Sequence, residues 1–164
     1  MSTMVPRDLV FADRAPWIFD FDGLVTGTPA EVWAAFIDND SWTIWFANCK
    51  RCRATSDPFD GVGSTRSIEV NGLRVDERFI AWQPERLWAF TATAMRMSFA
   101  TSLVERALFD EPEPGRTHIA YRMAMQPKFW AIPIRRLVAS QAAKAFAKSF
   151  AALDTHLADV RAIS

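Results

Sequence analysis

The amino-acid sequence predicts an α+β domain in which a curved, seven-stranded antiparallel sheet wraps around one long C-terminal helix, with two short helices between the first two strands. Three observations predict this fold. A capped helix start follows an aromatic strand near the N-terminus, and turn sequences divide residues 49–126. From Pro133 to about Val160 the chain then shows a helical apolar pattern without internal Gly or further Pro.

The first strand and the first helix are predicted from aromatic alternation and capping chemistry. Residues 15–25 alternate aromatic with other side chains, which is typical of a strand with one buried face. Thr28 offers an N-cap, Pro29 suits the first helical position, and Glu31 completes a capping box. A second short helix is expected over about residues 41–46.

Turn sequences predict six further strands and their register. The turns are expected at 57–63, Asn71-Gly72, 83–86, Arg96-Met97 and 111–115. Pairing outward from them gives Arg66/Glu77, Ile68/Val75, Phe79/Phe90, Ala81/Trp88, Phe90/Leu103, Leu103/Met123, Glu105/Tyr121 and Ala107/Ile119. These pairs gather the large apolar residues on one face. A slip of one residue would scramble that pattern, so this face is expected to be the inner one.

The long helix carries an apolar arc that should face the sheet. Phe146 and Leu153 lie in this arc at 100° per residue, whereas most charged residues lie outside it. Three small residues, Ala142, Ala145 and Ser149, occupy the middle of the arc. They favour a cavity between helix and sheet, although close packing against the large sheet residues is the alternative.

The predicted inner face also carries polar groups. Arg66 with Glu77 and Glu105 with Tyr121 are expected pairs, because an unpaired buried charge is costly. They form either functionless ion pairs at half-solvated sheet ends or the polar end of an apolar pocket. Tyr121, Glu105 and Glu77 are weak catalytic candidates. The candidate ligand-binding residues are Trp45, Arg66, Glu77, Phe79, Trp88, Phe90, Phe99, Leu103, Glu105, Tyr121, Met123, Ala142, Phe146 and Phe150.

Composition limits the classes of partner. Lys plus Arg equals Asp plus Glu at 19 each, which gives no reason to expect nucleic acid. No apolar run approaches the ~20 residues of a membrane-spanning helix. Residues 1–14 are expected to be an N-terminal extension without the apolar segment of a signal peptide, and residues 15–162 a single ligand-binding domain. We therefore expect a cytoplasmic protein, monomeric or homodimeric.

Cys49 and Cys52 form a lone C-x-x-C motif. A zinc site would need a second pair or nearby histidines, and a redox site a strand-to-helix junction. In the predicted strand, residues 49 and 52 point to opposite faces, so we expect two ordinary thiols. No metal and no cofactor are expected, because phosphate loops, cofactor fingerprints and Ser-His-Asp sets are missing from the sequence.

A basic segment coincides with the entry to the long helix. Residues 127–153 contain five Lys or Arg and no acidic residue, and "FWAIPI" (129–134) is apolar. This segment is either a contact for an anionic membrane or an acidic ligand at the cavity mouth, or a solvated basic face beside a hydrophobic helix entry.

Several stretches resemble one known family in order. They are "TPAEVWAAFIDNDSWTIWFANC", "DGVGSTRSIEV", "VDERFIAWQPERLWAF" and "PGRTHIAYRM". Over about residues 17–160 the chain resembles the START-like helix-grip (SRPBCC) superfamily, especially its polyketide cyclase/dehydrase and lipid-transport group. The resemblance implies a hydrophobic cavity between sheet and long helix, with its mouth near the short helices and strand loops. Trp42 and Trp45 are expected at that rim.

Two functions follow as hypotheses. The first is binding or transport of a hydrophobic small molecule such as a lipid, fatty acid or polyketide-like compound. The alternative is an aromatase/cyclase-like enzyme acting on a ketone in the same cavity, with Tyr121 and a carboxylate as acid and base. A single Tyr and the lack of an evident inner-face His weigh against catalysis.

Overall fold

The computed structural model describes every residue except residue 97, so the predicted turn at Arg96-Met97 lies partly outside the described residues. Seven strands form one antiparallel sheet in the order β2-β8-β7-β6-β5-β4-β3, and a short β1 pairs with β6. The strands are β1 (Ser2–Thr3), β2 (Trp17–Thr26), β3 (Cys49–Ala54), β4 (Thr65–Val70), β5 (Leu73–Gln83), β6 (Leu87–Met95), β7 (Ala100–Glu113) and β8 (Arg116–Pro127).

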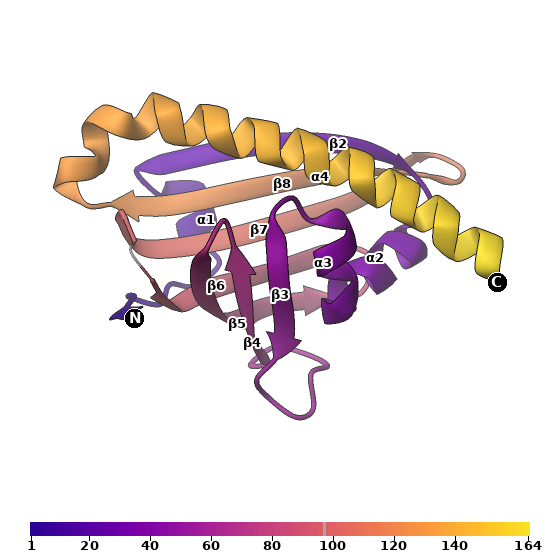
Figure 1. The fold of residues 1–164 in the computed structure, drawn as a ribbon, viewed down its shortest axis with the longest axis horizontal. Helices are drawn as coiled ribbons and strands as arrows, with labels where there is room; N and C mark the ends of the chain where they lie inside the picture. Colours follow the sequence, from indigo (N-terminus) through magenta and orange to yellow (C-terminus); the bar gives the residue numbers. More distant parts are fainter. Residues whose placement is uncertain (97) are drawn as a thin grey trace.

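The helices are α1 (Phe11–Arg14), α2 (Pro29–Ile37), η1 (Asn39–Ser41), α3 (Trp42–Trp45), η2 (Phe129–Ile134) and α4 (Arg135–Ile163). The long helix α4 lies along β2 and β8, and the strands β5, β4 and β3 curve round opposite it (Figure 1). The predicted architecture is therefore confirmed. Among the described residues, no helix combines the length and the apolar character needed to cross a bilayer.

The register is confirmed around the first hairpin and differs by two residues farther on. Arg66 pairs with Glu77, and Asn71 and Gly72 have the positive φ angles of 53° and 75° that a two-residue turn requires. Phe90, however, pairs with Glu105 instead of Leu103, and Glu105 pairs with Met123 instead of Tyr121.

Between β7 and β8 the shift arises because both strands run almost to the tip of their hairpin, leaving only Pro114 and Gly115 between them. The shift between β6 and β7 belongs to the separate connection that follows Met95. A shift of two residues keeps every side chain on its predicted face. The pair Ala81/Trp88 is also wrong, because an irregularity after Phe79 aligns Ala81 with Ala89.

The capping chemistry of α2 is confirmed. The backbone N–H of Glu31 donates to Thr28 Oγ1 at 3.3 Å, and the N–H of Thr28 donates to Glu31 Oε2 at 2.7 Å. Helix α3 follows, with both of its tryptophans buried: Trp42 is 1% and Trp45 2% exposed. Both rings pack against Phe36, at centroid distances of 5.7 and 5.2 Å, and of the two expected at the cavity rim only Trp42 belongs to the cavity lining.

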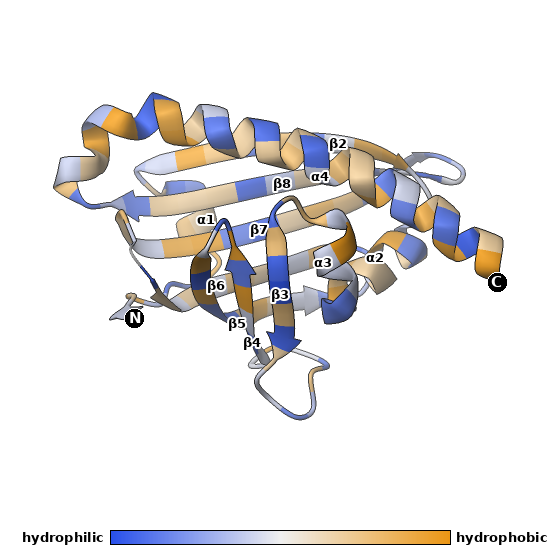
Figure 2. Ribbon diagram, in the orientation of Figure 1, coloured by the Kyte–Doolittle hydropathy of each residue, from blue (hydrophilic) through white to orange (hydrophobic). Residues whose placement is uncertain are grey.

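The long helix packs unequally along its length. Its buried residues, Phe146, Ser149, Phe150, Leu153 and Leu157, begin near the middle of the helix, and none precedes Phe146. Figure 2 shows hydrophobic and hydrophilic residues alternating along α4, as an amphipathic helix requires. In its first half the small inward residues Ala142 and Ala145 are only half-buried. Helix and sheet are therefore in close contact at one end of α4 and separated at the other.

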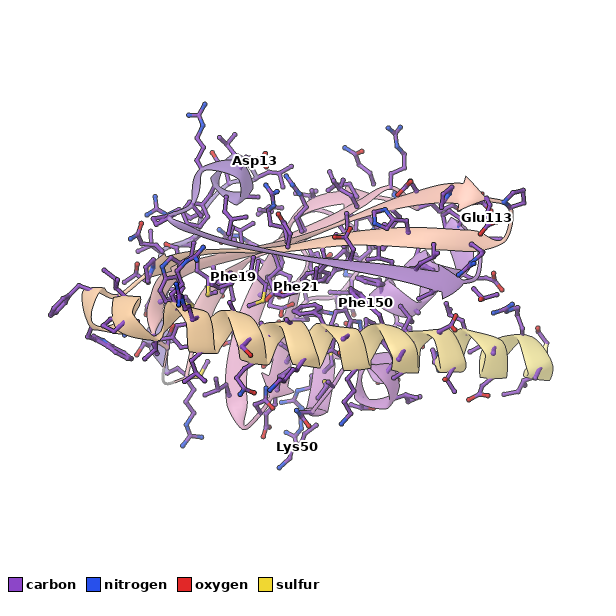
Figure 3. All side chains as sticks on the ribbon, turned by 90° about the horizontal axis from the view of Figure 1, so that it is seen from above. Asp13, Phe19, Phe21, Lys50, Glu113 and Phe150 are labelled. Carbon is purple, nitrogen blue, oxygen red and sulfur yellow. The ribbon has the colours of Figure 1, made fainter. Side chains whose placement is uncertain are left out.

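Three contacts fix the second half of α4. The ring of Phe150 lies between helix and sheet, in close contact with Gly23 of β2 (Figure 3). The backbone N–H of Ala47 donates to Ser149 Oγ at 2.9 Å, and that of Thr26 donates to Asp154 Oδ1 at 2.6 Å. These bonds attach the helix to the α3–β3 connection and to the end of β2.

The N-terminal segment lies between β6 and β7 where these two strands move apart. Pairing of β6 with β7 covers Leu87 to Thr91 only. Beyond this, the N–H of Met4 donates to Thr93 O at 3.0 Å and the N–H of Val5 donates to Thr101 O at 2.9 Å. Residues 4 and 5 thus fill the gap between the strands.

The expectation that Cys49 and Cys52 point to opposite faces is wrong. Both thiols are free and buried, at 8% and 5% exposure. A register irregularity between Cys49 and Arg51 inserts one residue, so both side chains turn inward. Burial raises the pKa of Cys52 to about 12, which keeps this thiol protonated and unreactive.

Gly23 allows the close approach of α4, and its replacement should cost stability. A Cβ atom on residue 23 would lie 2.6 Å from two ring carbons of Phe150, closer than real contacts allow. Gly23→Ala should therefore lower the free energy of unfolding by about 1–3 kcal/mol in urea denaturation. Gly61→Ala is the control, because a Cβ there meets nothing within 4 Å. Equal losses in the two variants would contradict the packing argument.

Candidate functional site

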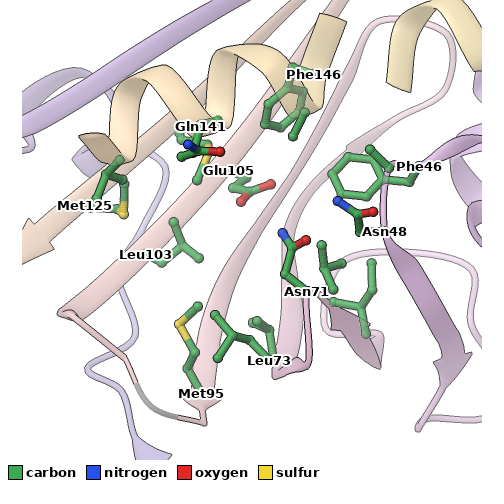
Figure 4. A pocket seen from close by; sticks show the side chains of 18 of the residues that line it. Phe46, Asn48, Asn71, Leu73, Met95, Leu103, Glu105, Met125, Gln141 and Phe146 are labelled. Carbon is green, nitrogen blue, oxygen red and sulfur yellow. The ribbon is translucent and has the colours of Figure 1, made fainter. Parts of the chain in front are cut away.

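A cavity of about 660 Å³ lies between the first half of α4 and the concave face of the sheet. Figure 4 shows its side chains converging from α4, β7 and the β4–β5 hairpin. The wall is mainly apolar. Its apolar residues include Ile68, Val75, Phe90, Leu103, Met123 and Met125 from the sheet and Val138, Ala142, Ala145 and Phe146 from α4. The small residues of α4 therefore border open space, as the cavity interpretation of the sequence predicts.

One side of the cavity opens to solvent. Asn48, Asn71 and Gln141 line it and are exposed, and Figure 4 shows their amide groups near the opening. On α4, residues 137, 141, 144 and 148 follow the spacing of a single helix face and form one border of the opening. We call this opening the mouth.

Arg66 and Glu77 form a buried ion pair in the cavity wall. Arg66 Nε lies 2.6 Å from Glu77 Oε2, and the two side chains are 0% and 3% exposed. The guanidinium carbon lies 4.1 Å from the centroid of the Trp42 ring, and Nη1 donates to Asn39 Oδ1 at 3.3 Å. Burial opposes the charge on Arg66, but the Glu77 carboxylate outweighs it and raises the pKa of Arg66, so the guanidinium stays charged.

Glu105 places a second carboxyl group in the cavity. Figure 4 shows this carboxyl between Leu103 and Phe146, directed into the open space. The Tyr121 hydroxyl donates to Glu105 Oε2 from behind the wall. Burial raises the pKa of Glu105 to about 8, with a smaller contribution from the charge of Glu77. At neutral pH the group is therefore a neutral carboxylic acid.

The position of the acid proton follows from the donors. Burial and the neighbouring Glu105 raise the pKa of Tyr121 well above its usual value. The Tyr121 hydroxyl therefore stays protonated and acts as the hydrogen-bond donor to Glu105. Since Oε2 of Glu105 accepts this bond, the acid proton lies on Oε1. No hydrogen bond from a described residue reaches Oε1, so Glu105 offers one donor to the cavity.

Most sequence-predicted ligand residues line the cavity. They are Arg66, Glu77, Phe90, Phe99, Leu103, Glu105, Met123, Ala142 and Phe146. The others, Trp45, Phe79, Trp88, Tyr121 and Phe150, lie outside its lining. Trp45 and Trp88 pack on Phe36, and Phe150 packs on Gly23. Tyr121 reaches the cavity only through Glu105. Of the catalytic candidates, Glu77 and Glu105 line the cavity and Tyr121 does not.

Sequence reasoning missed the polar border of the mouth. Among the lining residues that were not ligand candidates are Asn48, Asn71, Met95, Leu137 and Gln141, whereas Lys144 and Lys148 were considered only as part of the basic segment at the mouth. The four on α4 had a detectable signal, because their spacing places them in one row beside the apolar arc. Asn48 and Asn71 had none, since no register was predicted for β3; its pairing with β4 sets Cys49 opposite Val70 and so places residues 48 and 71 side by side. The backbone N–H of Asn71 donates to Asn48 O at 3.2 Å.

The raised pKa of Glu105 should make the stability of the folded protein depend on pH. The folded state keeps the proton up to about pH 8, whereas the ordinary carboxyl of the unfolded chain loses it near pH 4.5. The folded state binds more protons in this window, so the contribution of Glu105 to stability falls as pH rises through it. Glu105→Gln should therefore become progressively more stable than the parent protein between these pH values, in urea denaturation at several pH values. Glu85→Gln, in an exposed turn, is the control; a pH-independent difference for Glu105→Gln would contradict the assignment.

Residues 23–160 match the family described as polyketide cyclase / dehydrase and lipid transport. An uncharacterized protein of Mycobacterium tuberculosis is 29% identical over 124 residues, which cover 72% of this chain and 71% of that protein.

Solved structures show the same fold. A START superfamily protein from Mycobacterium smegmatis has a TM-score of 0.71 at 12% identity, covering 87% of this chain and 98% of that chain. A protein of Thermus thermophilus has a TM-score of 0.73 at 12% identity, covering 88% of this chain and 99% of that chain. At these identities the likeness concerns the fold alone. The family match, however, runs from β2 to the last turns of α4, and the chain therefore belongs to the polyketide cyclase/dehydrase and lipid transport family.

Proposed function

We propose that the protein binds or transports a hydrophobic small molecule, such as a lipid, a fatty acid or a polyketide-like compound, in the cavity under α4. The observation that carries this proposal is the cavity itself. Its volume of about 660 Å³ lies within the range of roughly 300–1,000 Å³ that is usual for small-molecule sites. Its wall is apolar with a few convergent polar groups, which is the usual composition of such sites. Membership of a family that includes lipid transport supports the same conclusion.

The polar groups define which end of the ligand lies deepest. Glu105 offers a hydrogen-bond donor, and Arg66 adds a positive charge that Glu77 largely neutralises. Such a wall favours a neutral oxygen acceptor, for instance a ketone, an ester or a protonated carboxyl group. The rest of the ligand would lie along Leu103, Met123 and Ala142 toward the mouth.

Filling the cavity should abolish uptake without adding a charge. Ala142→Trp places a large side chain in the open space and should weaken binding of a fluorescent fatty acid at least about tenfold, because an overfilled site costs roughly 1–3 kcal/mol. Ala143→Trp is the matched control, because the neighbouring residue is exposed on the same helix. Fluorescence titration measures both variants. Undiminished uptake by Ala142→Trp would contradict the site.

A second candidate function is catalysis on a ketone. The observation that favours it is the neutral carboxyl of Glu105, which faces the cavity and is suited to donate a proton to a carbonyl oxygen. Tyr121 would position Glu105 and would not touch the substrate, because it lies outside the lining.

Glu105→Gln separates the two functions. The amide keeps a neutral donor but has no acid proton to transfer, so a binding protein should retain affinity for a poly-β-ketone probe within about threefold. An enzyme should retain this affinity and lose conversion of the probe by about 10²–10⁴-fold, measured by liquid chromatography and mass spectrometry. Conversion at an unchanged rate in Glu105→Gln would exclude Glu105 as the acid. If the parent protein binds the probe without converting it, binding alone is supported.

A further inference from the structure

An exposed apolar group lies at the start of the C-terminal helix. Phe129 is 85%, Trp130 55%, Ile132 58% and Leu137 58% exposed, and the first three belong to η2. Large apolar residues that gather on a surface in this way mark an interaction site more often than a fold requirement.

This group lies next to the cavity mouth. Ile134 and Leu137 line the cavity, so η2 and the first turn of α4 form part of its wall. The N–H of Lys128 donates to Phe99 O at 2.9 Å, which ties η2 to the segment before β7. Met95 and Phe99 of that neighbouring segment also line the cavity. The exposed apolar group and the mouth are therefore continuous.

Cations surround the same surface. Residues 127–153 contain Lys128, Arg135, Arg136, Lys144 and Lys148 and no acidic residue. Within the described part of the chain, none of the five forms an ion pair with a carboxylate, although Arg135 stacks over Phe19 at 5.2 Å. Arg135 and Arg136 also oppose the dipole of α4 at its N-terminus. The fold therefore gains little from these charges.

We propose that this surface docks on an anionic lipid bilayer and that the cavity mouth meets the bilayer there. The docking face consists of Phe129, Trp130, Ile132 and Leu137 with Lys128, Arg136, Lys144 and Lys148. Exposed aromatic and aliphatic side chains enter the headgroup boundary, and Lys and Arg attract anionic headgroups. A second copy of the chain is a poorer occupant, since it would bring like charges together. Docking would let an apolar ligand pass between bilayer and cavity without crossing water.

The proposal rests on exposed groups and not on the identity of the ligand, so it is tested with vesicles that carry no added ligand. Sedimentation should show binding to vesicles of phosphatidylcholine with phosphatidylglycerol at low salt. Binding should be much weaker with pure phosphatidylcholine and should fall at high salt, where charges are screened. Lys128→Gln and Arg136→Gln should each weaken binding about fivefold.

Trp130→Glu and Phe129→Glu test the apolar part separately. Each should weaken vesicle binding at least about tenfold, because a large apolar side chain loses its burial. Ile163→Glu is the matched control: Ile163 is 87% exposed at the other end of α4, and the change in charge is the same. Circular dichroism checks that all variants fold. If either Trp130→Glu or Phe129→Glu fails to fold, the other variant still tests the apolar part of the surface.

Three results would overturn the proposal. The first is no sedimentation with anionic vesicles at low salt. The second is an equal effect of Trp130→Glu and Ile163→Glu. The third is a dimer in analytical ultracentrifugation that Trp130→Glu dissociates, together with no vesicle binding by the parent protein, which would make this face a contact between copies. Because uptake of a fatty acid into the cavity is measured independently, failure of docking leaves the proposed binding function standing.

Discussion

The approach of Phe150 to Gly23 determines the shape of the whole interior. A single helix crossing a curved sheet cannot touch it equally everywhere, because the sheet twists and coils beneath it. Its closest packing against a glycine lies in the second half of α4, where Gly23 of β2 admits the ring of Phe150. Hydrogen bonds that Ser149 and Asp154 accept from the backbone N–H groups of Ala47 and Thr26 fix this part of the helix. The first half of α4 must then stand away from the sheet, and its small residues leave that space open.

The two carboxyl groups of the cavity are accommodated in different ways, one by pairing with a cation and the other by keeping its proton. Arg66 and Glu77 use the first solution, since each compensates the other within an enclosure of aromatic rings. Glu105 uses the second, because burial outweighs the hydrogen bond from Tyr121 and the charge of Arg66, and the group stays protonated at neutral pH. The two carboxyl groups of the cavity therefore differ in their partners, a guanidinium for Glu77 and a phenol hydroxyl for Glu105, and the protonated Glu105 adds a hydrogen-bond donor to the wall.

Sequence reasoning predicted the fold through local chemistry. The capping box at Thr28 and the turn at Asn71-Gly72 need only a few neighbouring residues, and both formed as predicted. The inner face was also predictable, because even the two-residue error at Phe90 preserved side-chain direction. The prediction that Cys49 and Cys52 point to opposite faces was wrong, because a bulge in β3 reverses the direction of the following side chains and leaves no signal in the sequence.

Sequence reasoning could predict which residues lie on the inner face of the sheet, but not which of these residues line the cavity. The inner face contained Phe90 and Trp88 alike, but whether a ring meets the cavity or another ring depends on the placement of α2 and α3. The neutrality of Glu105 was likewise hidden, since it arises from the depth of burial of the carboxyl group.

The N-terminal segment between β6 and β7 has a practical consequence for handling the protein. Ser2 pairs with Met95, a residue of the cavity lining, so any tag fused ahead of Ser2 would emerge beside the mouth. A tag there would crowd the proposed docking face and add its own charge and bulk to both binding assays. Ser164, at the exposed far end of α4, offers an attachment point remote from both surfaces.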